Sequence, residues 1–538
     1  SGFTQDLVLT NDMIKKLKRM EMTIDDLYAA GVIDYISPEE EENTHIAADL
    51  QTLREHQGDP LEIYTHCEIP ACIMGIAALT SPYAHHNQPP RITFQTNQTK
   101  QTCGWYSLSW PFRVDKHAFL QYYAELPLIK TLANKYVYHN GMNSLVSIMY
   151  YTGYNQEDSL IHNISAAQRG YVKGVAFGFL QAELDKNEHF GNPDQIHTVD
   201  IKNHANYAKI IKGFPAKGTI LNNRDVVIGR FTEIPKPTDR RLYRDTSVVY
   251  SNNESATVES VIRARDQEGI EFAKVKYSSV RELGIGSKFS SRAGQKGVTG
   301  LGLTQADLAF NEDGMSPVLK INPHAIPSRM TIGQLLEGLC GKLAAINGSI
   351  GDATFFRDSD IDAVGDAMEI RGWDRYGNER MYDGMTGEWI DTLIFNTPVY
   401  YQRLQKFVVE EVYSISTGPT CVLTRQPLEG KSNRGGLRIG EMEKDCIISH
   451  GEGHFICEKF RDDSDGFEIY VCRTCGSRPV VNEQIGLVIC KTCQSTGLVP
   501  QVHRVRSTWA SNLFFNELES IGVGVNLGVE PYAYEIHQ

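Results

Sequence analysis

The sequence lacks three features that would each assign it to a well-defined class of protein. No apolar run approaches the roughly 20 residues of a membrane span, and the N-terminal segment SGFTQDLVLT is not a secretory signal peptide. The G-x4-G-K-[ST] motif of P-loop nucleotide hydrolases does not occur, which excludes ATP hydrolysis of that type. We therefore expect a soluble intracellular protein with no membrane partner. The sequence does not resolve nucleus, cytoplasm or virion.

Internal repeats and low-complexity tracts are also missing. The 538 residues are 22% charged and 41% hydrophobic, which is typical of folded domains and too apolar for a disordered chain. A chain of this length is expected to form three or four domains of roughly 150 residues each. Strand-rich segments alternate with helical ones, so the sequence predicts a mixed α/β multidomain protein.

Acidic residues are scarce in three stretches of a chain whose net charge is −13. Residues 69–114 and 283–306 contain no Asp or Glu, and residues 421–440 contain Glu429 alone. The basic residues there are Arg91, Lys100, Arg113, Lys288, Arg292, Lys296, Arg425, Lys431, Arg434 and Arg438. Because local charge binds phosphate, the pattern indicates a segregated positive surface suited to a nucleic acid, with chance clustering as the alternative.

Local patterns predict several elements. Capping residues and apolar periodicity predict helices over 11–20, 23–30, 331–347 and 399–412, and from 507 or 508 to about 522. Residues 173–284 carry alternating strand candidates, VVIGRFTEI, SVVYSNNESATVESVI and FAKVKYSSV, and predict a separate β-rich module.

The eleven cysteines fall into two groups. We expect reduced, mostly buried thiols at Cys67, Cys72, Cys103, Cys340, Cys421, Cys446 and Cys457. The pairs Cys472-x2-Cys475 and Cys490-x2-Cys493 are separated by 14 residues. Thiolates at this spacing converge on one ion, which predicts a structural zinc ribbon with its two knuckles on facing hairpins. Four unrelated thiols are the alternative, and His450, His454, Cys457 and His503 are weaker candidate ligands.

An acidic segment, Asp358-Ser-Asp360-Ile-Asp362 followed by Glu369, imitates a calcium loop. Its sixth position is Ala363, where a calcium loop needs glycine for a sharp turn. The same spacing imitates a polymerase aspartate triad, but no strand pattern surrounds it. We expect a solvated polar loop.

Three further segments carry candidate chemistry. In GYNQEDS, Glu157 and Asp158 follow a Gly-Tyr-Asn turn, where adjacent carboxylates can face one cation. In GSKFSSRAGQKG, small residues alternate with basic ones, so the backbone can approach phosphates; a structural turn is the alternative. PHAIPSRMT delivers Arg329 just before a helix N-terminus, where anions bind well.

These three segments, then PVYYQRLQKFV, LTRQPLEGKSNRGGLRIGEMEKD and the four cysteines, follow one another in a fixed order, and HNQPPRITFQTNQTKQ precedes them. This order resembles the C-terminal half of the second-largest (β-like) subunit of multisubunit DNA-directed RNA polymerases of the eukaryotic and archaeal kind. The resemblance covers essentially the whole chain and is weakest in 173–284 and 351–385. Family members are usually longer, so we expect either a split subunit or one piece of a longer product. A large DNA virus is compatible with both.

The resemblance divides the chain into five segments, two of which belong to one core. The family assigns residues 1–66 to the end of the external region and 67–172 and 285–455 to a hybrid-binding core with a double-psi β-barrel. It assigns residues 173–284 to the wall (flap) and 456–538 to the anchor and the zinc-bearing clamp piece with its helix.

The resemblance also implies roles for individual residues. The catalytic set is Arg91 and Arg329 near the incoming triphosphate, with Lys288 and Lys296 near the RNA 3′ region and nucleotide phosphates. The nucleic-acid-binding set is Lys100, Arg292, Gln295, Arg425, Lys431, Arg434 and Arg438. Glu157 and Asp158 match the acidic pair beside the second, nucleotide-borne Mg²⁺. The family motif usually has Asp where this chain has Ser287, so we expect different local hydrogen bonding there.

The implied reaction is attack of the RNA 3′-hydroxyl on the α-phosphate of an NTP, with two Mg²⁺ ions and release of pyrophosphate. The aspartate triad for the permanent metal belongs to the largest subunit in this family, and no DFDGD occurs here, so we expect the chain to be inactive alone. The implied partners are the largest subunit, the N-terminal half of the second-largest subunit, small assembly subunits, template DNA and the RNA–DNA hybrid. A non-catalytic zinc-ribbon scaffold and a calcium-binding protein are the alternatives.

Overall fold

The computed structural model describes residues 7–56, 61, 63–69, 73–194, 196–238, 241–357 and 360–530. Cys72 and Asp358 lie outside these residues. The chain forms two compact units, Ser1–Glu411 and Val412–Gln538, and each mixes helices with strands, as the sequence predicts. Among the described residues, no helix combines the length and apolar character that crossing a membrane requires.

A closed β-barrel organises the first unit. Its strands are β5 (Met142–Ile148), β6 (Ser159–Asn163), β19 (Lys288–Ser291), β20 (Lys296–Leu303), β22 (Leu319–Ile321) and β25 (Trp389–Arg403). Their order is β19-β20-β6-β22-β5-β25, and β19 also pairs with β25, which closes the ring. The pairs β20–β6 and β22–β5 are parallel. Val146, Leu160, Phe289, Leu319 and Val399 are buried in the core.

Strand β25 corrects the helix predicted over 399–412. The strand pairs with β5 from Phe395 to Tyr401 and also with β24 (Asn378–Tyr382), which β21 (Phe310–Asn311) extends. Only α11 (Val408–Glu411) is helical in that segment. From residue 394 to 403, β25 is buried or partly buried on both faces, so the segment IFNTPVYYQR lacks the apolar–polar alternation that identifies a half-exposed strand.

Helices and short strands cover the barrel. They are α6 (Ile76–Leu79), α7 (Pro89–Thr99), α8 (Ile164–Gln168), α9 (Ile332–Asn347), α10 (Ile361–Ile370), β4 (Ile129–Lys130) and β23 (Gly351–Asp352). The 3₁₀ turns are η1 (Ala84–His86), η2 (Leu132–Lys135), η3 (Pro323–Ala325) and η4 (Pro327–Arg329). Helix α9 ends at Gly348, whose φ of 65° only glycine adopts readily, which confirms the predicted stop. A Cβ on Gly338 would lie 2.3 Å from Thr397 Oγ1, so glycine lets α9 approach β25 closely.

Residues 361–370 of the acidic segment form α10, which corrects this part of the predicted loop. The Asp360 side chain caps the helix by accepting a hydrogen bond from the Ala363 N–H at 3.0 Å. Within the helix, Asp362 and Asp366 both pair with Arg375, which is 13 and 9 residues further along the chain. Asp362 and Asp366 are therefore side chains of one helix that pair with the guanidinium of Arg375. A calcium loop instead directs its carboxylates from a turn toward one ion.

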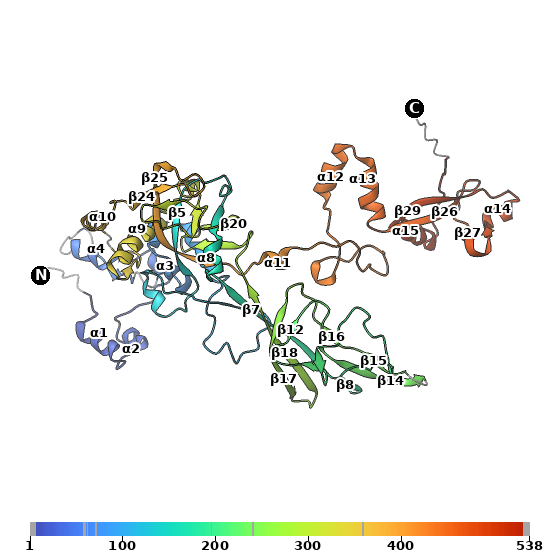
Figure 1. Ribbon diagram of the computed structural model, residues 1–538, viewed down its shortest axis with the longest axis horizontal. Coiled ribbons are helices and arrows are strands. Elements are labelled where there is room, and N and C mark those ends of the chain that lie inside the picture. The colour runs from blue at the N-terminus through green and yellow to red at the C-terminus, as the bar shows by residue number, and fades with distance from the viewer. Residues whose placement is uncertain are drawn as a thin grey trace. The chain divides into compact units, whose positions relative to one another are not determined.

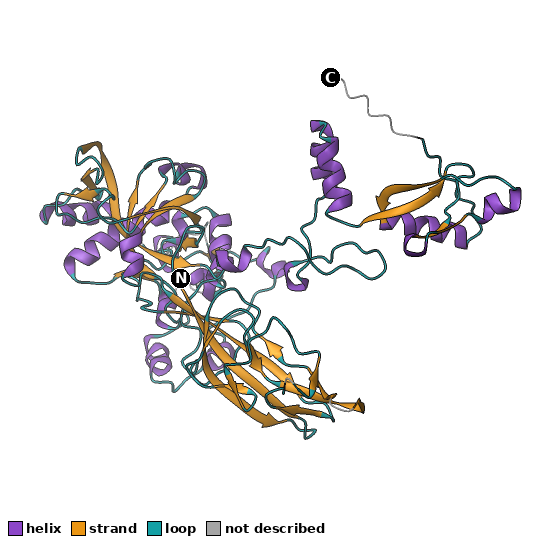
Figure 2. Cartoon of the chain, turned by 45° about the vertical axis from the view of Figure 1, so that its right-hand side comes forward, coloured by secondary structure: helices purple, strands orange, loops and turns teal. Residues whose placement is uncertain are grey.

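The β-rich module predicted over 173–284 is present (Figures 1 and 2). One sheet has the order β12 (Ile220–Leu221), β17 (Ala256–Arg265), β18 (Glu271–Arg281), β7 (Gly174–Glu183) and β3 (Ala118–Gln121). A second has the order β8 (Glu188–Phe190), β14 (Arg230–Thr238), β15 (Arg241–Asp245) and β9 (Thr198–Val199). The remaining pairs are β10 (Ile210–Ile211) with β11 (Phe214–Pro215) and β13 (Val226–Ile228) with β16 (Val248–Val249). Strand β3 pairs with β7 although it lies outside the predicted range of 173–284. Local sequence patterns do not show this pairing, because it joins residues that are far apart in the chain.

The N-terminal elements of the first unit are α1 (Asn11–Lys18), α2 (Ile24–Ala29), α3 (Pro38–Glu41), α4 (Leu50–Glu55), β1 (Ile46–Ala47) and β2 (His66–Cys67). The predicted caps are present. The Thr10 side chain accepts a hydrogen bond from the Met13 N–H, and Thr23 and Asp26 form a capping box.

The second unit carries the cysteine pairs. Its elements are α12 (Glu441–His450), α13 (Gly453–Cys457), β26 (Gly466–Cys472), β27 (Val480–Asn482), β28 (Leu487–Ile489), α14 (Lys491–Thr496), β29 (Val502–Thr508) and α15 (Trp509–Ser520). The turns η5 (Lys431–Asn433), η6 (Glu458–Asp462) and η7 (Glu483–Ile485) complete it. Helix α15 confirms the predicted C-terminal helix, with Thr508 as its N-cap.

Candidate functional site

A small pocket of about 30 Å³ lies where several barrel segments meet. Its lining comes from the start of β6, the β19–β20 turn, the end of β22, the 3₁₀ turns η3 and η4, and β25. The charged and polar side chains in this lining include Asp158, Gln295, Lys296, Asn322 and Arg329. Four of the residues that the sequence singled out, Asp158, Gln295, Lys296 and Arg329, thus share one pocket although they come from three distant segments of the chain.

The GYNQEDS turn presents the carboxylates. Glu157 and Asp158 have φ values of 47° and 68°, a left-handed conformation uncommon for residues other than glycine. Buried Asn155 holds the turn, since its Nδ2 donates to the Met149 carbonyl at 2.7 Å and its Oδ1 accepts from the Tyr151 N–H at 3.3 Å. Both carboxylates are exposed, and Asp158 lines the pocket.

Arg329 projects into the pocket from η4 and has two partners. Its Nη2 forms an ion pair with Asp158 Oδ1. Its Nη1 donates to Gln295 Oε1 at 2.7 Å. The side chains of Arg329 and Asp158 are 20% and 44% exposed, so the ion pair is open to solvent and to charged ligands.

Arg91 approaches the same place from α7. Its Nη1 donates to the Gly294 carbonyl at 3.4 Å, and a Cβ on Gly294 would lie 2.3 Å from the Arg91 carbonyl oxygen. Burial lowers the pKa of Arg91, the charge of Arg329 lowers it further, and Asp158 opposes both. Arg91 therefore lies within electrostatic reach of both Arg329 and Asp158.

Asn87 joins the segments that carry the two arginines. Its Oδ1 accepts a hydrogen bond from the Gly333 N–H, at the start of α9, at 2.9 Å. It also forms an isolated β-bridge with Thr331. Asn87 lies in the segment HNQPPRITFQTNQTKQ, but the sequence does not single it out, because its contact with Gly333 spans 246 residues.

The β19–β20 hairpin carries the two predicted lysines. Lys288 stands opposite Val298 and Ser290 opposite Lys296, so the two lysines share one face of the hairpin. Lys296 is exposed and lines the pocket, whereas the Lys288 ammonium pairs with Glu411 at 3.2 Å. Ser287, at the position where the resemblance implies Asp, accepts a hydrogen bond from the Gly284 N–H through its hydroxyl at 3.3 Å.

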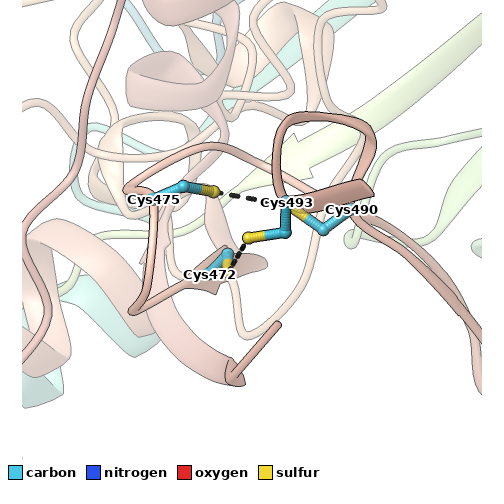
Figure 3. Close-up of side chains that lie close together, drawn as sticks. All are labelled: Cys472, Cys475, Cys490 and Cys493. Atoms are coloured by element: carbon cyan, nitrogen blue, oxygen red, sulfur yellow. Dashed lines mark hydrogen bonds between the residues drawn. The ribbon is translucent and has the colours of Figure 1, made fainter. Parts of the chain in front are cut away.

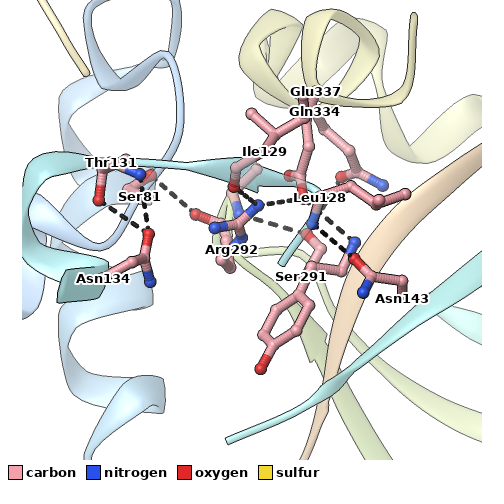
Figure 4. A network of polar contacts seen from close by, with 12 residues as sticks. Ser81, Leu128, Ile129, Thr131, Asn134, Asn143, Ser291, Arg292, Gln334 and Glu337 are labelled. Carbon is pink, nitrogen blue, oxygen red and sulfur yellow. Dashed lines mark hydrogen bonds and ion pairs between the residues drawn. The ribbon is translucent and has the colours of Figure 1, made fainter. Parts of the chain in front are cut away.

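Arg292 and Gln295, two members of the predicted nucleic-acid-binding set, are buried. Arg292 is 1% exposed, and its Nη2 donates to the Ile129 carbonyl at 2.8 Å and to Glu337 at 2.7 Å (Figure 4). Gln295 is 7% exposed and its amide is bonded within the protein. Both side chains are bonded within the protein, Arg292 to Glu337 of α9 and Gln295 to Ala325 of η3.

The other predicted nucleic-acid contacts lie on exposed surface. Lys100 is the exposed C-cap of α7 in the first unit. Arg425, Lys431, Arg434 and Arg438 are exposed in the second unit. The Arg425 guanidinium lies 3.5 Å from the centroid of the Trp509 ring, a cation–π contact that holds its loop against the start of α15.

The four clustered cysteines converge as predicted (Figure 3). Their Sγ atoms all lie within 4.8 Å of one another, with Cys472–Cys493 at 3.6 Å and Cys475–Cys490 at 3.4 Å. A tetrahedral Zn²⁺ with Zn–S bonds of about 2.3 Å separates its sulfurs by roughly 3.8 Å, so the geometry fits. The sequence predicts a hairpin for each pair, and the second pair differs: Cys490 is the N-cap residue of α14, and Cys493 lies in the first turn of that helix.

The surroundings of the four thiols affect their pKa values in opposite directions. A hydrogen bond with the Ser477 hydroxyl lowers the pKa of Cys490, whereas burial raises the pKa of Cys493. Four adjacent thiols cannot all ionise without a positive charge between them, and a divalent ion supplies that charge.

Comparison with known proteins gives consistent matches. The family described as "RNA polymerase Rpb2, domain 6" matches residues 77–433, that described as "RNA polymerase Rpb2, domain 7" matches 435–530, and that described as "RNA polymerase Rpb2, domain 5" matches 25–70. The chain is 39% identical to "DNA-directed RNA polymerase II subunit 2" of Arabidopsis thaliana, over 96% of this chain and 45% of the relative. It is 37% identical to "DNA-directed RNA polymerase subunit 2" of Acanthamoeba polyphaga mimivirus, over 91% of this chain and 44% of the relative. The chain spans about half the length of the curated relatives it matches.

Proposed function

We propose that this chain, which belongs to the RNA polymerase Rpb2, domain 6 family, supplies part of the active site of a DNA-directed RNA polymerase. The observation that carries the proposal is the convergence of Arg329, Lys296 and Asp158 on one pocket, with Arg91 in electrostatic reach. Two guanidinium groups and an ammonium group suit the phosphates of an NTP, and they can neutralise the charge that develops as pyrophosphate leaves.

The carboxylates of Glu157 and Asp158 suit a second role. They are adjacent, exposed oxygen donors, the ligand type that Mg²⁺ prefers. A bound Mg²⁺ would stabilise charge on the attacking and leaving oxygens. Asp158 would then be one of the residues that hold the metal, and Arg329, which pairs with Asp158 in this structure, would be available to bind phosphate.

The remaining assignments are proposals of the same kind. The six-stranded ring is proposed to be the double-psi barrel of a hybrid-binding core formed by 67–172 and 285–455, and 173–284 to be the wall. Residues 1–66 would close the external region, and 456–538 would form the anchor and clamp piece. Lys288, Lys100 and the basic residues of the second unit would contact RNA or DNA. The permanent metal, the largest subunit, the other half of this subunit and the small assembly subunits would come from other chains.

Arg329→Ala in the assembled polymerase tests the proposal by primer extension. We expect kcat/KM for the NTP to fall by about 100-fold, the scale for removing one preorganised charge-stabilising group. The matched control is Arg357→Ala, because the Arg357 side chain is 61% exposed and pairs with Asp352 outside the pocket. An unchanged extension rate and NTP dependence for Arg329→Ala would contradict the proposal.

A non-catalytic zinc-ribbon scaffold is the second candidate. The cysteine cluster and the exposed basic residues of the second unit favour it. It predicts nucleic-acid binding without extension, whether or not the largest subunit is present, and the same extension assay separates the two functions.

A further inference from the structure

Gln295 sits at the β19–β20 turn with both ends of its amide committed. Its Nε2 donates to the Ala325 carbonyl at 2.9 Å and to the Thr331 hydroxyl at 2.7 Å. Its Oε1 accepts from Arg329 Nη1 at 2.7 Å. Both amide hydrogens are used, and a flipped amide would turn its oxygen toward the Ala325 carbonyl. The orientation of the amide is therefore fixed by its surroundings.

The partners of this amide flank Arg329 on both sides. Ala325 ends η3, Thr331 is the N-cap of α9, and Arg329 lies between them in the chain. Met330, in the same segment, has a φ of 52°, which a non-glycine residue keeps only where its surroundings hold it. Gln295 thus connects the start, the end and the functional side chain of one short loop.

The two partners of Arg329 differ in charge and exposure. Asp158 is a 44% exposed carboxylate and neutralises the guanidinium, whereas Gln295 is 7% exposed and neutral. An arriving anion competes with the carboxylate for the charge of Arg329, but it does not need to displace a neutral amide. The hydrogen bond to Gln295 can persist while the ion pair to Asp158 is exchanged.

We propose that Gln295 is a positioning residue that holds the Arg329 guanidinium toward the phosphates of the substrate while leaving its charge unneutralised. The proposal rests on the proposed function, because the phosphates are those of an NTP. In this proposal Gln295 does not contact the substrate itself but acts by holding the Arg329 side chain in place.

The test uses the assembled polymerase and titrates NTP in primer extension. Gln295→Met keeps the length of the side chain and removes its hydrogen bonds, and we expect KM for the NTP to rise about 10-fold while kcat falls less. Gln295→Glu should raise KM at least as much, because its carboxylate would neutralise Arg329. The matched control is Gln334→Met: Gln334 is 1% exposed, bonds Ser291 and Tyr401, and should leave KM unchanged.

A second background separates positioning from simple stability. Lysine lacks the two Nη groups with which the Arg329 guanidinium contacts Gln295 and Asp158 together. In the Arg329→Lys background, adding Gln295→Met should therefore change KM by less than about 2-fold. An equal effect in both backgrounds, an unchanged KM, or a lower KM for Gln295→Glu would overturn the inference.

The same variants distinguish failure of this inference from failure of the proposed function. If the wild-type complex extends a primer and Gln295→Met leaves KM unchanged, the inference falls and the proposed function stands. If the wild-type complex does not extend, the proposed function falls, and inorganic tripolyphosphate binding by calorimetry decides the inference. Weaker binding by Gln295→Met than by Gln334→Met would support it, and equal binding would overturn it.

Discussion

Arg292 and Glu337 form an ion pair inside the protein, with Nη2 and Oε1 2.7 Å apart and side chains that are 1% and 2% exposed. Arg292 belongs to the β19–β20 hairpin, and Glu337 belongs to α9. Glu337 also accepts a hydrogen bond from the Tyr400 N–H of β25 at 3.1 Å. One buried pair therefore fixes the hairpin that carries Lys296 to the helix that follows Arg329.

Removing one member of this pair should destabilise the protein strongly. Glu337→Leu leaves an unpaired buried guanidinium, and we expect the free energy of unfolding to fall by about 3–5 kcal/mol. The double variant Arg292→Met/Glu337→Leu should recover most of this loss, because no charge remains buried. Denaturant unfolding measures both, with Arg244→Ala as the control at the exposed pair Arg244–Asp200. A double variant as unstable as the single one would contradict this account.

Lys320 should make stability depend on pH. It is fully buried, its Nζ lies 3.4 Å from the centroid of the Tyr151 ring, and burial lowers its pKa to about 7 against the opposing charge of Asp383. An unfolded lysine has a pKa of about 10.4, so between these values the unfolded state binds the extra proton. The destabilisation due to Lys320 is therefore complete below pH 7 and is relieved as pH rises toward 10.

The substitution Lys320→Met tests this dependence. We expect it to raise the free energy of unfolding by roughly 2–4 kcal/mol at neutral pH and by clearly less near pH 10. Thermal unfolding at both pH values measures the difference, with Lys217→Met as the exposed control. A gain that is the same at both pH values would show that Lys320 titrates normally.

Gly300 should be needed for the turn that carries Asp158. A Cβ at this position would lie 2.3 Å from the Tyr154 carbonyl oxygen, which is backbone and cannot rotate away. Gly300→Ala should therefore displace the turn, lower stability by about 1–3 kcal/mol and increase hydrogen exchange across 153–159. Gly284→Ala is the control, because a Cβ there meets nothing within 4 Å. Unchanged exchange in 153–159 would mean that the turn tolerates the methyl group.

Metal removal should loosen the second unit. We expect one zinc ion per chain by elemental analysis, and a strong chelator should raise hydrogen exchange in β26 and β29 while leaving the barrel strands protected. Cys472→Ser should lose the metal, whereas Cys446→Ser, at an exposed cysteine outside the cluster, should keep it. Retention of full zinc by Cys472→Ser and Cys490→Ser would rule out these ligands.

Local signals explain which elements were predictable. The caps at Thr10, Thr23 and Thr508 and the stop at Gly348 act within one helical turn, so the sequence shows them directly. The segment around Tyr400 was predicted as a helix because burial on both faces of β25 removes the alternation of a half-exposed strand.

By itself, the sequence determined the cysteine spacing, the strand-rich character of residues 173–284 and the order of motifs that marks the family. Each of these depends on residues close together in the chain or on their order. Only the tertiary structure decided which basic residues face solvent. Lys296 and Arg292 are four residues apart in one glycine-containing hairpin, yet one lines the pocket and the other is buried against Glu337. The physical reason is that burying a charge is costly unless a partner compensates its lost hydration, and the partner of Arg292, on α9, is 45 residues away.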